Sequence, residues 1–593
     1  MPKQQAKTRA PARPQPTQRP ARTNAVTWLC ALVPVAATVA VRANAFGYGF
    51  IWDDPLVLQQ LRAIHGLGDL FVLPEAIPKF YYRPLIFLTF LADRALGGEA
   101  PFWFHTTVIV ADAVATLLVF LIARRLLGVA FTIEAGLAAL LFAVHPIHVE
   151  SVVWIAGRSD VIATVFMLAA LLASTWTDRS WTAWLAGGLA LLAFLSKEVA
   201  AALLVLVPLR DRLMQRRLPW ARYLPLALAG GVYLVLRYVG LGAVGTGLPS
   251  HVTATDQIRD LVAGLGWYAC KLIAPVHLTA YVPAVPSAPG YVIAGVVTLI
   301  GTGATALWAA RSGQGVPAFL LVWFIVTLAP SLGVIVRRSA SAPVADRYLY
   351  LPSVAAAIMV AWLVSRLRPA PVWRWRAAVA GVACVATVAG ALTVDRTRVW
   401  GDPLVFWSDV VANAPQVGMP YRERGNIYMG LGKLDEAERD FRAAAMFEKE
   451  PEGRVMNYNN YGNLYLRRNQ LGAAEAAYKA GLQIYQHAFL YSGLGRVEIR
   501  KAEEAQENGK SDAAMQAVHA ARDYLEQAVA VDPRDYKSHV LLGQVLFNLR
   551  EYPAAREHFE IGLAIEPRGA VADTARRFLA RMPREQSAVD SRQ

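Results

Sequence analysis

The sequence predicts an all-α protein in two parts: a polytopic bundle of about eleven membrane-spanning helices, followed by an α-solenoid of paired helices. Apolar runs long enough to cross a membrane recur from Ala25 to about Val394, whereas the chain from Trp400 to Gln593 is polar and repetitive. A hydrophobic content of 55% over 593 residues is too high for an ordinary soluble protein. The composition therefore agrees with a large membrane domain.

The charge pattern indicates a membrane topology rather than nucleic-acid binding. The formal net charge is +15, but the basic residues gather beside apolar runs, where they hold loops in the cytoplasm. Residues 1–24 predict a disordered basic cytoplasmic tail. We expect a membrane domain over 25–398 that begins with a retained first helix, a repeat domain over 399–582 and a disordered tail over 583–593.

The remaining spans are assigned so that each basic cluster lies on the cytoplasmic side of the membrane. Counting 258–276 as a span would put the basic cluster at 366–376 outside, so we interpret 258–276 as a re-entrant or interfacial helix. The first span is near 25–41, and the others are expected near 102–123, 133–147, 160–176, 182–196, 199–213, 223–242, 291–310, 317–335, 350–366 and 376–394.

This topology places four polar islands on the outer face, which is the main sequence signal for a site. They are "WDDP" (52–55), "HPIHVESVVWIAGRSD" (145–160), "LSKE" (195–198) and "VRRSASAPVADRYLYLPS" (336–353). Charged groups at membrane depth are costly, so Arg158, Asp160, Lys197 and Glu198 should face a protein interior or a water-filled cavity. The alternatives are a neutralised Lys197–Glu198 pair and a turn-closing Arg158–Asp160 ion pair.

The adjacent carboxylates of the first island have two interpretations. Asp54 before Pro55 is typical of a helix N-cap followed by proline at the first helical position. That leaves Asp53, beside Trp52, placed to act as a general base on a hydroxyl. The alternative is that the pair only starts a helix.

Cations in the other islands predict a phosphate site. Arg158, Lys197 and Arg347 can hold a phosphate leaving group without a metal, and Asp346 and Tyr348 flank Arg347 as further substrate-binding candidates. Arg337 and Arg338 either join this set or anchor the chain at the membrane interface.

His145, His148 and Glu150 raise the question of a metal. Pro146 breaks helical geometry between the histidines and no further ligand has suitable spacing. We therefore expect these groups to hydrogen-bond substrate or to tie the outer loop together, and we expect neither a metal nor another cofactor. The cysteines Cys30, Cys270 and Cys384 lie in apolar segments and are spaced for neither zinc nor a disulfide framework.

The C-terminal part repeats with the tetratricopeptide period. Pro533 and Pro567 mark a period of about 34 residues, and related units begin near Tyr421 and Asn457, with a third around 494–533 that carries a polar insertion. In each unit a small residue fits the position where the paired helices pack closely: Gly425, Gly462, Gly495 and Gly543. Aromatic residues fit the core position of the second helix: Phe441, Tyr478 and Phe559.

Such a solenoid has a concave surface suited to extended peptide. Tyr458, Asn459, Asn460 and Tyr461 are candidates for contact with that peptide. The alternative for the tyrosines is packing between helices.

Taken together, the motifs resemble one family, the transmembrane and tetratricopeptide-repeat O-mannosyltransferases, relatives of the protein O-mannosyltransferases within the C-type (GT-C) glycosyltransferases. The matching stretches are "FIWDDP", "YYRPL", "HPIHVESVVWIAGRSD", "LSKE", "ADRYLYLP" and the repeats, in that order.

The resemblance implies an enzyme that moves a sugar from a polyprenyl-phosphate carrier to Ser or Thr hydroxyls of exported proteins. The family name implies that the sugar is mannose, and the transfer should invert the anomeric configuration. By this resemblance Asp53 would be the catalytic base, with Asp54 beside it. The charge of the lipid phosphate would be neutralised by Arg158, Lys197 and Arg347. The lipid or sugar pocket would be shaped by Tyr82 and Arg83. We expect a bacterial inner membrane, with the N-terminus cytoplasmic and the site and repeats periplasmic, and no nucleic-acid partner.

Two other functions stay open from sequence. One is a ligase that moves a lipid-linked glycan to a non-protein acceptor. The other is a non-catalytic membrane scaffold whose repeats recruit envelope proteins.

Overall fold

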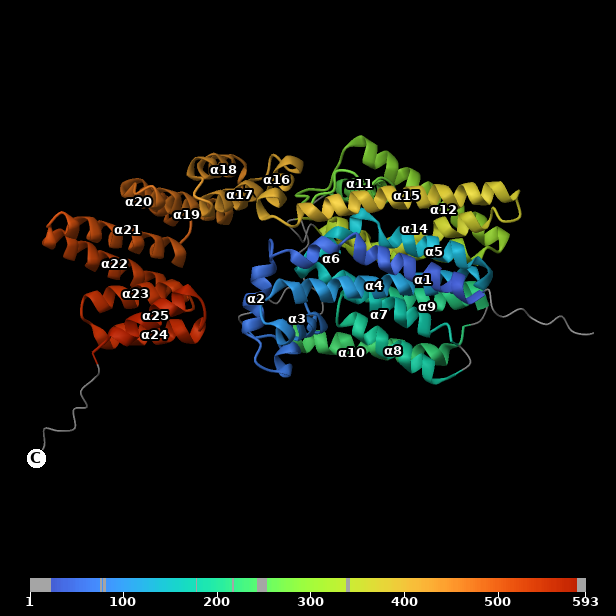
Figure 1. Cartoon of the computed structure of the whole chain (residues 1–593), viewed down its shortest axis with the longest axis horizontal. Helices are drawn as coiled ribbons and strands as arrows, with labels where there is room; N and C mark the ends of the chain where they lie inside the picture. The colour runs from blue at the N-terminus through green and yellow to red at the C-terminus, as the bar shows by residue number, and fades with distance from the viewer. Residues whose placement is uncertain are drawn as a thin grey trace, which may run out of the picture. The chain divides into compact units, whose positions relative to one another are not determined.

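The computed structural model describes residues 23–74, 77, 81–176, 179–215, 218–242, 253–337 and 342–583. Within these residues the protein is all-α and contains no strand, as predicted, and it forms two compact units that divide between Asp402 and Pro403 (Figure 1). Most of both predicted tails, and Arg338 of the fourth polar island, lie outside the described residues. Each unit is described by itself.

The first unit is a bundle of long apolar helices and short polar ones. Its helices are α1 (Thr23–Ala40), α2 (Asp54–Arg62), α3 (Pro84–Gly97), α4 (Pro101–Leu127), α5 (Thr132–Ala143), α6 (Val149–Val153), α7 (Ser159–Ala173), α8 (Trp181–Phe194), α9 (Leu203–Arg210), α10 (Leu224–Leu241), α11 (Ala254–Ile273), α12 (Pro289–Ser312), α13 (Gly315–Arg337), α14 (Tyr350–Ser365) and α15 (Val372–Val399).

Seven helical segments in the described chain are long and apolar enough to cross a membrane, and eight are if the bent pair Val129–Ala143 and Pro146–Val153 counts as one span. Two shorter apolar helices, Ala25–Ala40 and Trp181–Phe194, accompany them. The expected total of about eleven is not confirmed. One reason is that the run expected near 199–213 is broken into a 3₁₀ segment, Glu198–Ala202, and the 8-residue α9.

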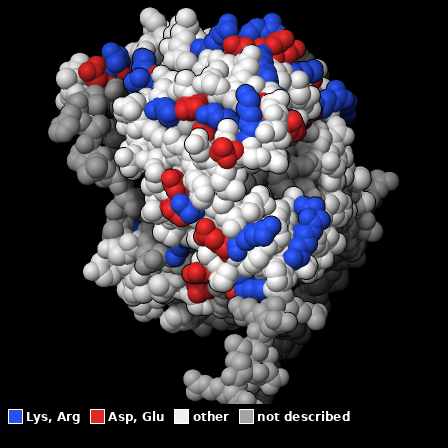
Figure 2. Space-filling view, turned by 90° about the vertical axis from the view of Figure 1, so that its left-hand side faces the viewer, with Lys and Arg blue, Asp and Glu red and all other residues white. Residues whose placement is uncertain are grey.

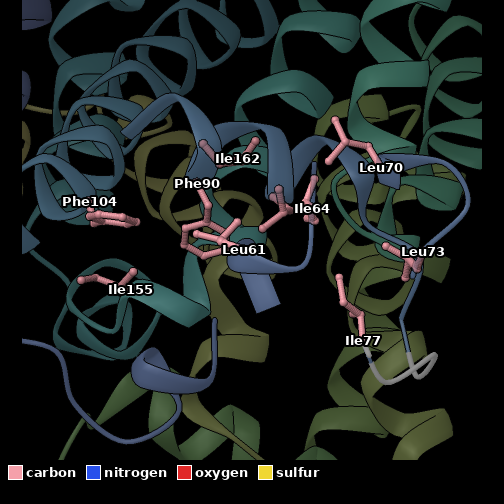
Figure 3. Packing of buried hydrophobic residues seen from close by; sticks show 10 residues of the cluster. Leu61, Ile64, Leu70, Leu73, Ile77, Phe90, Phe104, Ile155 and Ile162 are labelled. Atoms are coloured by element: carbon pink, nitrogen blue, oxygen red, sulfur yellow. The ribbon is translucent and has the colours of Figure 1, made fainter. Parts of the chain in front are cut away.

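A hydrophobic cluster fixes the polar segment that contains Asp53 and Asp54. Leu61 of α2 packs with Phe90 of α3, Phe104 of α4 and Ile155, which precedes α7 (Figure 3). All four side chains are buried. Burial of such side chains is worth about 1.5–3 kcal/mol each, so this cluster holds the end of α2 against the segment that precedes α7.

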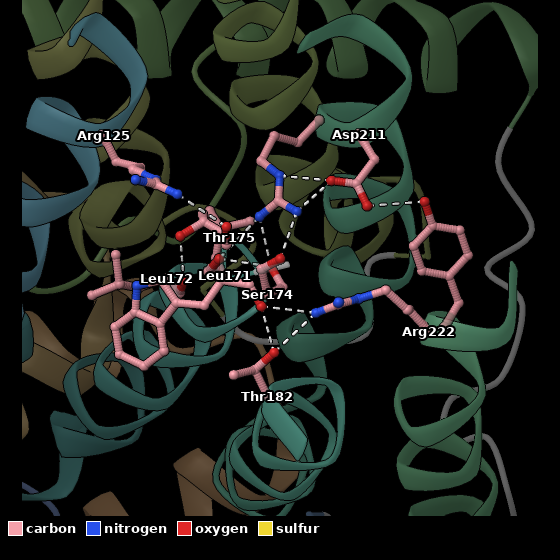
Figure 4. A network of polar contacts seen from close by, with 11 residues as sticks. Arg125, Leu171, Leu172, Ser174, Thr175, Thr182, Asp211 and Arg222 are labelled. Carbon is pink, nitrogen blue, oxygen red and sulfur yellow. Dashed lines mark hydrogen bonds and ion pairs between the residues drawn. The ribbon is translucent and has the colours of Figure 1, made fainter. Parts of the chain in front are cut away.

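The opposite end of α7 carries a separate polar network (Figure 4). Arg210 donates to Asp211, to the Ser174 hydroxyl and to the Ser174 carbonyl, and the Tyr223 hydroxyl donates to Asp211. Asp160 lies in the first turn of the 15-residue α7 and Ser174 follows its last residue. At 1.5 Å rise per residue the two ends lie about 20 Å apart, so this network is remote from the polar islands.

The second unit is a solenoid of helix pairs. Its helices are α16 (Pro403–Asn413), α17 (Gly418–Gly430), α18 (Leu434–Phe447), α19 (Pro451–Arg467), α20 (Leu471–Leu482), α21 (Ala488–Glu507), α22 (Ser511–Val531), α23 (Tyr536–Asn548), α24 (Tyr552–Ile565) and α25 (Ala570–Arg581). The polar insertion of the third repeat lengthens its two helices to 20 and 21 residues instead of forming a long loop.

The small positions of the repeats occur where helices touch. A Cβ atom added to Gly462 would lie 2.4 Å from the ring of Tyr478, and one added to Gly543 would lie 2.8 Å from the ring of Phe559. Gly425 meets Phe441 in the same way, whereas Gly495 meets Leu525. The repeat interpretation of these glycines is therefore confirmed.

Surface charges on one face of the molecule are mixed. Figure 2 shows basic and acidic side chains interspersed there instead of a continuous basic stripe. The solenoid contains paired charges, such as Arg468 with Asp435 and Glu438, and Lys501 with Glu475.

Candidate functional site

The two adjacent aspartates occupy different environments. Helix α2 begins at Asp54, and Asp53 holds the N-cap position without a capping bond from its side chain. The Asp54 carboxylate is 1% exposed and accepts hydrogen bonds from the amides of Ile51 (3.0 Å) and Ala156 (2.9 Å). Because α2 already begins at Asp54, the prediction that Asp54 is the N-cap is wrong. The Asp54 side chain instead ties the first island to the second.

Asp53 is the accessible member of the pair, since its side chain is exposed. Next to it, Trp52 adopts a left-handed backbone conformation (φ 56°) and stacks on Trp154, with ring centroids 4.7 Å apart. Burial raises the pKa of the Asp54 carboxyl to about 7, against the lowering effect of its two amide partners. Asp53 is thus the carboxylate of the pair that solvent reaches.

Arg83 and Glu198 form the first of three cation–carboxylate pairs. The Arg83 guanidinium lies 3.1 Å from a Glu198 oxygen, and Arg237 of α10 lies 3.0 Å from the other oxygen. Burial opposes ionisation of Glu198, but the two arginines and backbone hydrogen bonding outweigh it and lower the pKa to about 2. Arg83 also donates to the Ser159 hydroxyl at the start of α7.

Lys197 and Asp160 form the second pair. The Lys197 ammonium lies 2.6 Å from each oxygen of Asp160, and the two side chains are 12% and 10% exposed. The ring of Tyr348 lies 5.3 Å from the same ammonium. Since Lys197 pairs with Asp160, neither pairing considered from the sequence, Lys197 with Glu198 or Arg158 with Asp160, is present.

Arg347 and Glu150 form the third pair. Glu150 binds both the guanidinium and the backbone amide of Arg347, the latter at 3.0 Å. The guanidinium also lies 5.3 Å from the Trp154 ring and 5.0 Å from the Tyr348 ring. Trp154, which stacks on Trp52, therefore connects this cation to the segment that carries Asp53.

Arg158 belongs to none of the three pairs. It is fully buried, forms an ion pair with Asp93 at 2.6 Å, donates to the Phe104 carbonyl and lies over the Phe90 ring. Sequence reasoning missed Asp93 and Arg237, although each is a charge within an apolar helix, α3 and α10 respectively. That signal could have identified both.

The two histidines bind within the protein. His145 Nε2 bonds the Leu272 carbonyl at 3.0 Å, and His148 Nε2 bonds the Ser353 hydroxyl at 2.8 Å. Because a carbonyl only accepts, His145 carries its proton on Nε2. In the described part of the chain no three His, Cys, Asp or Glu side chains gather as a metal site.

Tyr82 and Asp346 are buried beside the pairs. The Tyr82 ring lies 6.2 Å from that of Tyr233, and its buried hydroxyl bonds to no group among the described residues. Asp346 is 3% exposed, and one of its carboxylate oxygens likewise lacks a partner within the described chain. The islands thus converge on one polar cluster with unused hydrogen-bonding groups.

Curated proteins similar to this chain share one description. The chain is 34% identical over 181 residues to protein O-mannosyl-transferase Tmtc1 of Drosophila melanogaster, covering 28% of this chain and 21% of that protein. It is 36% identical over 221 residues to TMTC2 of Mus musculus, covering 33% and 25%. These matches therefore span a quarter or less of the relatives' own length.

One family model matches part of the second unit. Residues 422–450 match the family model described as tetratricopeptide repeat. Among solved structures, the chain is similar to YrrB, titled a TPR protein with an unusual peptide-binding site, at 18% identity and a TM-score of 0.21, covering 29% of this chain and 82% of that one. Yeast Tom70 matches at 11% identity and a TM-score of 0.24, covering 77% and 95%.

The curated matches agree with the motifs and the repeats that suggested the family. Over part of its length this chain is similar to curated protein O-mannosyl-transferases, which belong to the family that its motifs resemble.

Proposed function

We propose that this protein is a membrane glycosyltransferase that moves mannose from a polyprenyl-phosphate carrier to Ser or Thr hydroxyls of exported proteins. One observation carries the proposal: an exposed carboxylate, Asp53, lies in a segment stacked against a cluster of partly exposed cations. The names of the curated relatives support protein O-mannosyl transfer in particular.

The cations suit a phosphate because each already binds an oxyanion. Arg83, Lys197 and Arg347 hold Glu198, Asp160 and Glu150, and the exposed fractions of the three cationic side chains range from 12% to 21%. A lipid phosphate at this cluster can accept hydrogen bonds from the same donors. Arg158 stays outside the set and is proposed to hold α3 to α7 through Asp93.

The reaction is a single displacement. Asp53 accepts the proton of the acceptor hydroxyl, the hydroxyl oxygen forms a bond to the anomeric carbon, and the bond from that carbon to the phosphate oxygen breaks. The electron pair leaves with polyprenyl phosphate, whose added charge the cations stabilise. Attack opposite the leaving group inverts the anomeric configuration.

The positive-inside pattern supports a cytoplasmic N-terminus and an outward-facing site, and we place the protein in a bacterial inner membrane. The separation of the Arg210 network from the cluster along α7 agrees with two membrane faces of different character. The solenoid is proposed to hold the acceptor protein. No step of this mechanism uses a metal.

The test is transfer of radiolabelled mannose from polyprenyl-phosphate-mannose to periplasmic protein by membranes that contain the protein. Wild type should label protein, Asp53→Asn should not, and Asp435→Asn, which changes a repeat carboxylate with an exposed fraction of 91%, should label normally.

Equal labelling by wild type and Asp53→Asn would exclude Asp53 as the base. Absence of labelling with every form would contradict a mannose donor and favour another sugar or the scaffold.

A further inference from the structure

Glu198 is the most exposed of the three carboxylates that pair with the cations of the site. Its side chain is 34% exposed, against 10% for Asp160 and 4% for Glu150. Its partner Arg83, at 21%, is likewise the most exposed of the three paired cations. The Arg83–Glu198 pair is therefore the one that an incoming anion reaches most easily.

Glu198 also differs from the other two carboxylates in being held by two cations. Its oxygen Oε2 lies 3.1 Å from the Arg83 guanidinium, and Oε1 lies 3.0 Å from that of Arg237 on α10. Among the described residues, Asp160 and Glu150 each form an ion pair with a single cation. An anion that takes Arg83 therefore leaves Glu198 with a cation, whereas the same exchange at either other pair would take away the cation that its carboxylate has.

Arg237 is placed to hold Glu198 rather than to bind a ligand itself. Its side chain is 8% exposed, and its guanidinium also donates to the Tyr233 hydroxyl, one turn earlier on α10, at 3.0 Å. The Tyr233 ring stacks on that of Phe194 from α8, with centroids 5.4 Å apart. Because the guanidinium is already oriented toward Glu198, keeping that carboxylate costs little further side-chain entropy.

A phosphate and a carboxylate that share one cation repel each other, since both are anionic. If Arg83 were the sole partner of Glu198, a phosphate bound to Arg83 would leave a partly buried carboxylate without a countercharge, and binding would be weakened. A second arginine on the far oxygen removes most of that penalty.

We propose that the phosphate of the polyprenyl carrier displaces Glu198 from Arg83, and that Arg237 is the positioning residue that keeps Glu198 paired during this exchange. Arg237 acts through Glu198 and touches neither the lipid nor the acceptor hydroxyl. Before the lipid arrives, Glu198 satisfies Arg83; afterwards the phosphate takes the same hydrogen-bond donors.

This inference rests on the proposed function for the identity of the ligand, a polyprenyl phosphate. It needs neither Asp53 nor an acceptor protein, so the exchange at Arg83 can be tested without sugar transfer.

The test measures binding of farnesyl phosphate, a short polyprenyl phosphate, to the full chain in detergent by microscale thermophoresis. Arg237→Gln removes the second cation and should weaken binding about ten-fold or more. Glu198→Gln removes the carboxylate that competes for Arg83 and should bind at least as tightly as wild type. The double variant should bind like Glu198→Gln, because without the carboxylate the second cation is not needed.

The double variant separates positioning from a merely structural role, since damage to the fold by loss of Arg237 would persist in it. Arg259→Gln on α11 is the matched control, because Arg259 also pairs with two carboxylates, Asp256 and Asp260, and its side chain is 51% exposed. It should bind as wild type. Melting temperatures check that each variant is folded, and farnesol, which lacks the phosphate, should not distinguish the variants.

Three results would each overturn the inference: equal affinity of wild type and Arg237→Gln, weaker binding by Glu198→Gln, or a double variant as weak as Arg237→Gln. The same differences among variants with farnesol would also overturn it, because the phosphate would then have no part in them.

The two proposals can fail separately. Binding of farnesyl phosphate that is indifferent to Arg237→Gln refutes the inference and leaves the proposed function standing. The expected binding pattern without mannose transfer refutes the proposed function and leaves the exchange at Arg83 standing. Failure of wild type to bind farnesyl phosphate contradicts the polyprenyl-phosphate donor and the inference with it.

Discussion

At the scale of residues, the adjacent aspartates Asp53 and Asp54 differ in how far their side chains are exposed. Asp54 is buried and bound by two backbone amides, whereas Asp53, one position earlier, is exposed. Sequence reasoning assigned the cap to Asp54 because proline follows it, and the assignment failed because the Ala156 amide, distant in sequence, supplies one of the two hydrogen bonds.

The raised pKa of Asp54 predicts a pH dependence of stability. Burial raises this pKa from 3.8 to about 7. The folded value lies above the unfolded one, so the stabilising contribution is complete below about pH 4 and is lost as pH rises through about 7. The melting temperature of detergent-solubilised wild type should fall between about pH 4 and pH 7.

Asp54→Asn should remove the part of that dependence that this carboxyl contributes, although the variant is less stable because its amide nitrogen cannot accept from a backbone amide. Parallel melting curves of wild type and Asp54→Asn over the same range would contradict the assignment.

The buried Arg158–Asp93 pair predicts a large effect on stability. Both side chains are at most 1% exposed. Asp93→Asn leaves a buried guanidinium without its countercharge, which should cost about 3–5 kcal/mol of unfolding free energy. Denaturant unfolding of the purified protein measures this loss.

The exposed pair Arg62–Glu99, whose side chains are 36% and 35% exposed, is the control. Glu99→Gln should cost about 0–1 kcal/mol. A similar cost for both variants would show that Arg158 is not held as described.

At the scale of elements, helices of the solenoid approach one another through glycine. Gly462 on α19 faces the ring of Tyr478 on α20, and the same relation recurs in the first and last pairs. The aromatic side chain fills the space that each glycine leaves. Tyr461, which was a candidate for peptide contact, lies 6.0 Å from the rings of both Phe441 and Tyr465 and packs between helices.

This packing predicts a contrast between two glycines of one repeat. Gly462→Ala places a Cβ atom 2.4 Å from Tyr478 and should destabilise the repeats by about 1–3 kcal/mol. Gly472→Ala, on α20 with no atom within 4 Å of its added Cβ, should be neutral or stabilise by about 0.4–1 kcal/mol. Thermal unfolding followed by circular dichroism compares them, and a Gly462→Ala variant as stable as Gly472→Ala would refute the packing.

At the scale of the whole molecule, the chain comprises two units with separate cores. The clusters around Tyr478 and Phe559 contain residues of the second unit alone, and the cluster around Leu61 contains residues of the first. Each unit therefore buries apolar surface within itself.

Separate cores predict that residues 403–583 fold without the membrane domain. The fragment should be soluble and helical and should unfold cooperatively, since stacked repeats stabilise one another. Circular dichroism of the isolated fragment tests this. Loss of helix in the fragment would show that the first unit supplies part of its stability.

The sequence by itself determined the all-α class, the two-part architecture and the repeats, because membrane-length apolar runs and a fixed repeat period are local patterns. It also singled out the polar islands, since charge in an apolar run is costly wherever the helix packs. Lys197 and Arg347 could be selected in this way, whereas Arg83 was expected only from the family resemblance.

Only the tertiary structure decided which charges meet. Lys197 pairs with Asp160, Arg347 with Glu150 and Arg158 with Asp93, all between segments distant in sequence. Such pairings follow from helix packing, which spacing along the chain does not encode. For the same reason the structure separated buried Asp54 from exposed Asp53, and it placed Arg237 of α10 beside Glu198.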